Sequence, residues 1–93
     1  MAISALRHDE RPVRDERATD VRFADDQLVV DLRDGRTIAT PIIWYPTLRD
    51  ATDAQRANWQ LNGSGGGIHW PDIDEDLSVE GMLDGRPAFN WDR

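Results

Sequence analysis

The stretch Gly65-Gly-Gly-Ile-His-Trp-Pro-Asp-Ile-Asp-Glu-Asp-Leu-Ser-Val-Glu-Gly-Met-Leu83 decides the fold of this chain. Its segment Ile68-His69-Trp70 predicts a short strand that ends at Pro71, because proline cannot donate a hydrogen bond to a sheet. Four acidic residues follow, and Ser78 is a favourable N-cap for a short helix over residues 79–83. The stretch therefore predicts a strand, an acidic connection and a helix.

Three strands are predicted upstream of it. Val21 and Phe23 alternate with polar residues, Asp25-Asp26 supplies a turn, and a second apolar run covers residues 28–32. Asp34-Gly35 predicts a type I′ turn, which needs positive φ at both central positions, and residues 36–40 form the third strand. The pattern is that of an antiparallel meander.

The segment between the meander and the acidic stretch predicts short helices. The bulky cluster Ile42-Ile-Trp-Tyr45 is expected in the core, and Pro46 begins a helix that ends near Asp50. Thr52 is a plausible N-cap for a second helix, with Ala54, Ala57 and Trp59 against the core. A brief strand at residues 60–62 and a glycine-rich loop at residues 63–67 complete the connection, and Gly85 fits the left-handed position that ends the last helix.

Length and composition indicate one small domain. The chain has 93 residues, is 39% hydrophobic and contains no cysteine, so stability must come from a single modest core rather than from disulfides. No apolar run approaches the roughly 20 residues that span a bilayer, and the first 17 residues do not read as a signal peptide. We expect a cytoplasmic protein with a flexible arm (1–17), a domain (18–86) and a loose tail (87–93). In an alternative reading of the arm, Ile3 and Leu6 clasp a partner.

The charge is unevenly distributed. The formal net charge is −7, and because residues 1–22 hold five arginines and five acids, the excess lies in the remainder. An acidic surface gains no counterion release from nucleic-acid phosphates, so direct nucleic-acid binding is disfavoured. A basic protein partner is favoured instead by long-range attraction.

These elements predict an α+β fold: an N-terminal antiparallel three-stranded meander, short helices, two further short strands and a C-terminal short helix. The chain resembles the bacterial family catalogued as domain of unknown function 2442. The resemblance is carried by the segments Leu28-Val-Val-Asp-Leu-Arg-Asp-Gly-Arg36, Thr40-Pro-Ile-Ile-Trp-Tyr-Pro46, Gln55-Arg-Ala-Asn-Trp59 and Gly67-Ile-His-Trp-Pro-Asp-Ile-Asp-Glu-Asp-Leu77. It implies a small α+β domain, fused in some members to a helix-turn-helix domain. It also implies a second small protein encoded beside it, in the manner of a toxin and antitoxin pair.

Three motifs resemble a calcium loop, a metal-dependent active site and a phosphate-binding loop, and each lacks a residue or element that its function requires. Asp72, Asp74 and Asp76 open like a calcium loop, but Leu77 and Leu83 stand where that loop needs glycine and glutamate. His69 beside Asp72 and Asp74 could serve a metal-dependent enzyme, yet no nucleophile is positioned, and a hydrogen-bonded strand histidine is the simpler reading. The glycine-rich loop lacks the lysine and helix start of a phosphate cradle. We expect no catalytic residues, no metal and no cofactor.

The sequence therefore favours a non-catalytic interaction module, in the manner of an antitoxin or regulatory partner of an adjacent gene product. An acidic patch would meet the basic partner, with an apolar anchor beside it and Arg36 and Arg49 at the rim. The residues predicted to bind are Tyr45, Trp70, Asp72, Asp74, Glu75, Asp76 and Glu80. A transcription-associated regulator acting with a helix-turn-helix partner and the His/Asp enzyme are the alternatives, and self-association stays open.

Overall fold

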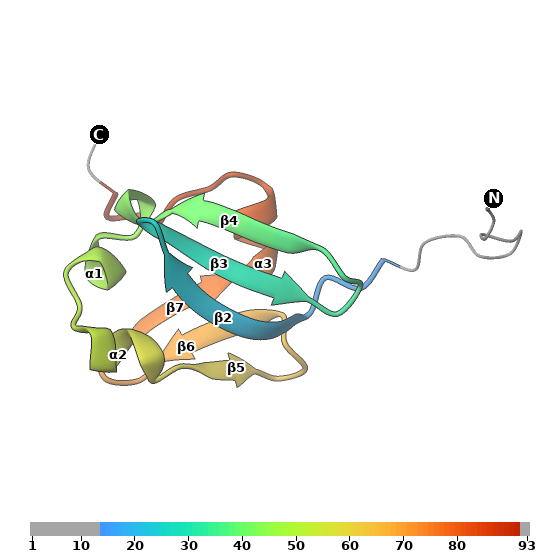
Figure 1. The fold of residues 1–93 in the computed structure, drawn as a ribbon, viewed down its shortest axis with the longest axis horizontal. Helices are drawn as coiled ribbons and strands as arrows, with labels where there is room; N and C mark the ends of the chain where they lie inside the picture. Colours follow the sequence, from blue (N-terminus) through green and yellow to red (C-terminus); the bar gives the residue numbers. More distant parts are fainter. Residues whose placement is uncertain (1–13, 92–93) are drawn as a thin grey trace, which may run out of the picture.

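A computed structural model describes residues 14–91. The first antiparallel sheet has the order β2-β3-β4 and the second β5-β6-β7. Their strands are β2 (Ala18–Ala24), β3 (Gln27–Leu32), β4 (Thr37–Pro41), β5 (Gln60–Asn62), β6 (Gly67–Trp70) and β7 (Glu75–Ser78). In Figure 1 the second sheet lies behind and below the first, and the helices connect or flank them. The α+β class and the N-terminal meander are confirmed.

The short helices form where their caps predict. They are η1 (Ile42–Trp44), α1 (Pro46–Arg49), α2 (Asp53–Ala57) and α3 (Val79–Leu83). Thr52 caps α2 in a capping box with Gln55, and the Ser78 hydroxyl accepts the Gly81 N–H at 2.9 Å at the start of α3. Gly85 takes a positive φ of 74° just beyond α3, as expected for a left-handed residue at a helix end.

A third strand, β7, stands where the sequence predicted only an acidic connection. It pairs with β6 in the register Ile68↔Leu77 and Trp70↔Glu75. Acidic residues are poor strand formers, but strand propensity yields to pairing and packing, and Leu77 packs against the core here. The pairing brings residues 75–78 into the second sheet.

The turn prediction was wrong in its detail. Positive φ at two successive residues occurs at Asp25 (53°) and Asp26 (63°), whereas between β3 and β4 only Gly35 (97°) has it. The connection from Leu32 to Thr37 is four residues long, too long for the two-residue type I′ turn. The tight turn of the meander is therefore built from two aspartates.

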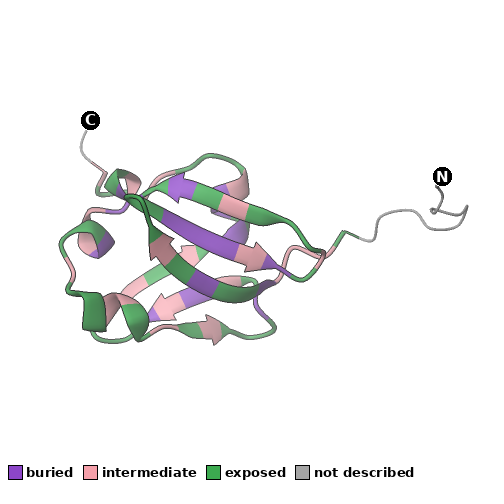
Figure 2. Cartoon of the chain, in the orientation of Figure 1, coloured by how far each residue is buried: buried purple, intermediate pink, exposed green. Residues whose placement is uncertain are grey.

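The core lies between the two sheets and includes residues from both (Figure 2). Trp70 is fully buried, its indole Nε1 donates to the Arg56 carbonyl at 3.1 Å, and its ring meets Phe23 edge-on with centroids 6.3 Å apart. Tyr45 is 1% exposed and its hydroxyl donates to Thr40 Oγ1 at 3.1 Å. Both rings have their polar atoms satisfied inside, so the prediction that they anchor a partner at the surface was wrong.

Other apolar residues lie less deeply than predicted. Ile43 is half exposed, and α2 buries no residue, with Ala54 and Ala57 both open to solvent. Trp59, just beyond α2, is the one member of that predicted group that packs against the core. The five-residue helix is too short to present a whole apolar face, so its capping box and flanking tryptophan position it.

Both chain ends of the described domain are held more firmly than the predicted arm and tail. The Arg17 and Asp15 carbonyls accept hydrogen bonds from the backbone N–H groups of Arg33 and Asp34, and Ala88 donates its N–H to the Trp44 carbonyl at 3.1 Å. Ile3 and Leu6 of the predicted arm lie outside the described residues. None of the helices in residues 14–91 is both long and apolar enough to cross a membrane.

Candidate functional site

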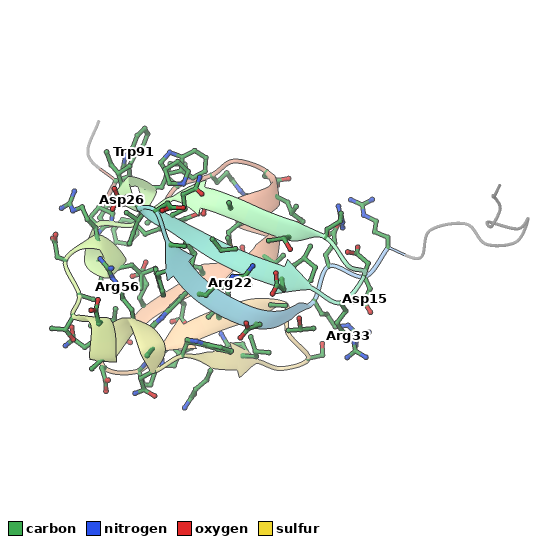
Figure 3. The ribbon with its side chains drawn as sticks, in the orientation of Figure 1. Asp15, Arg22, Asp26, Arg33, Arg56 and Trp91 are labelled. Atoms are coloured by element: carbon green, nitrogen blue, oxygen red, sulfur yellow. The ribbon has the colours of Figure 1, made fainter. Side chains whose placement is uncertain are left out.

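The two ends of the domain differ in how their acids are neutralised. The β2–β3 turn, α1, α2 and the β6–β7 turn meet at one end, and residues 14–17 with the β3–β4 turn form the other (Figure 1). Asp26 and Asp15, labelled in Figure 3, mark the two ends. We call the first the acidic end, defined by Asp25, Asp26, Asp53, Asp72, Asp74 and Glu75, and the second the paired end, defined by Asp15, Glu16, Asp34 and Arg14, Arg17, Arg33, Arg36.

At the paired end the carboxylates are bonded to arginine. Arg17 contacts Asp15 at 2.6 Å, and Arg36 contacts Asp34 at 2.8 Å and Glu16 at 3.3 Å. The Arg17 hydrogen bond lowers the Asp15 pKa to about 2, and the bonds from Arg36 hold the Asp34 pKa far below its ordinary value. Arg36, predicted at a partner rim, is thus engaged here.

At the acidic end the predicted hairpin acids have no arginine partner among residues 14–91. Asp72 accepts from Asn58 Nδ2 at 3.0 Å, which ties the β6–β7 turn to the end of α2. Asp74 is exposed and adopts a positive φ of 52°, a conformation that aspartate tolerates better than most residues. These side chains therefore keep their charge at the surface.

The pKa of Glu75 is raised by its surroundings at the acidic end. Glu75 pairs with the buried Trp70 across the sheet, so its side chain leaves from the inner face and is partly covered. This burial raises the Glu75 pKa, and the nearby carboxylates of Asp76 and Asp74 raise it further. A cation brought to this turn would favour the charged form of Glu75 and so oppose the rise in its pKa.

His69 and Asp76 lie on the outer face of the second sheet. His69 Nδ1 and Asp76 Oδ1 are 2.8 Å apart, and since an ionised carboxylate can only accept, Nδ1 carries the shared proton. Asn62 Nδ2 also donates to that oxygen, at 3.4 Å. The prediction of a strand histidine with a hydrogen-bonding partner is confirmed.

The predicted calcium-loop carboxylates engage different elements. Asp72 faces α2, while Asp76 faces His69, so the two side chains do not converge. Over the described part of the chain, no group of three His, Asp or Glu side chains is placed to hold a metal ion.

Glu80 does not join the predicted group. It lies in the first turn of α3, which follows the last residue of β7, whereas Glu75 is the first residue of β7. At about 3.3 Å per strand residue, its Cα is on the order of 15 Å from that of Glu75. Arg49, the other predicted rim residue, bonds Asp50 through Nε at 2.9 Å.

A groove that the sequence did not reveal opens at the acidic end, between β2 and α2. Its volume is about 600 Å³, and Phe23 and Trp59 supply its aromatic lining while Asp25, Asp26 and Asp53 supply carboxylates. The sequence signal was present in Asp25-Asp26, two acids at a turn that usually takes Asn-Gly. These two residues alone could not predict that the β2–β3 turn lies across the groove from α2.

The family model described as a protein of unknown function (DUF2442) matches residues 18–88. The chain belongs to the DUF2442 family. The predicted resemblance is therefore confirmed, and the match covers both sheets, α2 and the β6–β7 hairpin, which we call the acidic hairpin after Asp72, Asp74 and Glu75 at its turn. No curated protein matches the chain.

Two solved structures share the fold of this chain. A protein of unknown function from Rhodospirillum rubrum is 33% identical, with a TM-score of 0.69 over 80% of this chain and 92% of that one. An uncharacterised protein from Chromobacterium violaceum is 22% identical, with a TM-score of 0.68 over 80% of this chain and 70% of that one, a likeness of fold alone. The fold of this chain thus recurs in proteins of unknown function from two bacteria.

Proposed function

We propose that this DUF2442 protein is a non-catalytic interaction module whose acidic end binds a basic protein. The observation that carries the proposal is the separation of charge described above. Acids at the paired end are neutralised within the domain, whereas Asp72, Asp74 and Glu75 have no arginine partner in the described chain. Unpaired charges at one surface attract an oppositely charged partner and raise its association rate.

The helix lengths and contacts bear on the two alternatives. In residues 14–91 the helices are at most five residues long, too short to supply a recognition helix, so a transcription-associated role would need the helix-turn-helix of a separate partner. His69 faces Asp76, and Ser78 is engaged in capping α3, so no nucleophile and base stand together around them. A binding role needs neither a nucleophile nor a base and is compatible with these contacts.

The partner that we propose is the product of the adjacent gene, as the family resemblance implies. The test is co-expression of the two proteins, followed by affinity capture and size exclusion. We expect a complex that survives dilution at low salt and weakens as salt rises, because screening acts on exposed charges.

Two matched variants decide whether the acidic hairpin makes the contact. D72N/D74N removes two unpaired charges and retains a side chain that tolerates the positive φ of residue 74. D20N/D84N removes two exposed charges elsewhere, so the net charge changes equally. Loss of the complex in the first variant alone supports the proposal, and equal behaviour of the two variants would overturn it.

A further inference from the structure

The groove beside β2 suggests how the basic partner is bound. This inference rests on the proposed function. We propose that the groove between β2 and α2 takes an extended, arginine- or lysine-bearing segment of the basic partner as an added strand on β2. The groove volume of about 600 Å³ gives room for a short stretch of peptide rather than for a whole domain.

The backbone of β2 is free to receive such a strand. β2 is the edge of the first sheet, and its last residues, Val21 to Ala24, line the groove. Every second residue of an antiparallel edge strand points its N–H and C=O away from the sheet, ready to pair with another chain. At its other end β2 is covered, because Ala18 donates its N–H to the Gly65 carbonyl at 2.7 Å. Strand addition is therefore directed to the stretch that faces the groove.

The floor of the groove suits the side chains of an added strand. Phe23 and Trp59 are partly buried, so each offers part of its ring to the groove. Arg56 already stands over the Phe23 ring at 5.4 Å from its centroid, which demonstrates that a guanidinium fits against this aromatic surface. Alternate side chains of an added strand point to the same face of the sheet, so every second one can lie against this aromatic surface.

Charge selects the partner. Asp25, Asp26 and Asp53 line the groove and form no ion pair with another described residue. Arg22 is neutralised by Asp31 at 2.6 Å, and Arg56 donates to the Leu48 and Arg49 carbonyls at 2.9 and 2.8 Å. Three carboxylates therefore face two guanidiniums in the lining, one of them already paired with Asp31, and this excess of negative charge favours a basic strand. A second copy of this chain, with a net charge of −7, is repelled.

The test uses a synthetic peptide of alternating arginine and threonine, together with the same peptide N-methylated along one edge. Fluorescence anisotropy of the labelled peptide measures affinity for the full-length protein, and hydrogen exchange reports on the β2 amides. We expect N-methylation to weaken binding about tenfold or more, because methylation removes backbone pairing and leaves the charge intact. The unmethylated peptide should also slow exchange within residues 21–24.

Variants separate this inference from the proposed function. We expect D25N/D26N/D53N to weaken binding of both the peptide and the adjacent-gene product, because the groove is proposed to take a segment of that partner. Equal affinity for the two peptides, or unchanged β2 exchange, would overturn strand addition. If only D72N/D74N disrupts the protein complex, the acidic hairpin binds and the groove inference fails.

Self-association is the other outcome that would overturn the groove inference. It would be seen as a dimer of this chain in size exclusion.

Discussion

At the paired end of the domain each acid is bonded to an arginine, whereas the acids that define the acidic end form no ion pair with another described residue. Arg36 alone contacts both Asp34 and Glu16, while burial, followed by the neighbouring carboxylates of Asp76 and Asp74, raises the pKa of Glu75. The first arrangement stabilises its own turn. The second gains nothing for folding, which is why we assign it to binding.

The largest expected effect comes from Trp70, which joins the acidic hairpin to the core. Trp70→Ala removes a fully buried ring, its hydrogen bond to Arg56 and its contact with Phe23. We expect a loss of about 3–5 kcal/mol in the free energy of unfolding, a large part of the stability of a small domain. Denaturant unfolding measures it, with the fully exposed Phe89→Ala as the control. If Trp70→Ala lowered the free energy of unfolding as little as Phe89→Ala, the assignment of Trp70 to the centre of the core would be contradicted.

The two turns of the meander should respond in opposite directions. D25N/D26G places the preferred residues in the positive-φ positions and should stabilise the domain by about 1 kcal/mol. Gly35→Ala, in the opposite turn, should destabilise by a similar amount, since open space surrounds the added Cβ and only the φ of 97° opposes it. Denaturant midpoints measure both. The stabilised variant should also bind the arginine peptide more weakly, and tighter binding would argue against a role for these acids.

Asp34 tests the paired end through pH. Its folded pKa lies below the unfolded value, so its stabilisation is fully present above about pH 4 and is lost as the pH falls toward the folded pKa. Asp34→Asn should therefore lower the thermal midpoint by a few degrees at pH 7 and by less at pH 3. Scanning calorimetry at the two pH values measures it, with D84N as the control. A deficit that grows on acidification would reverse the sign of this argument.

Glu75 tests the acidic end and should show the smallest effect, with the opposite sign. Its folded pKa is raised, so its contribution favours folding below the unfolded pKa and is lost as the pH rises through the folded one. Glu75→Gln should raise stability by a few tenths of a kcal/mol at neutral pH, since solvent screens a half-exposed group. The gain should vanish below about pH 4, where the side chain is neutral in both states. A loss of stability at pH 7 would mean that the charged form is favoured.

Sequence reasoning found the parts of this protein that local chemistry dictates. Thr52 and Ser78 cap the helices because the side-chain oxygens reach N–H groups three residues on, a contact that spacing alone predicts. The strands of the meander followed from their alternation. The family followed from the segments around Pro46 and Trp70.

What depends on partners distant in the chain was not predictable. Residues 75–78 form a strand only because β6 lies beside them, and Tyr45 and Trp70 are buried only because two small sheets close over them. The acidic hairpin was found because its residues are adjacent in sequence. The groove was missed because Phe23 and Asp53, thirty positions apart, meet only in the fold.

One measurement tests the central claim most directly: a residue-by-residue map of amide chemical shifts as the basic partner, or the arginine–threonine peptide, is added to the ¹⁵N-labelled protein. We predict shifts at residues 21–26, 53–59 and 72–76 and little change at residues 14–17 and 33–36. Equal shifts at both ends, or shifts concentrated at the paired end, would contradict the assignment of binding to the acidic end.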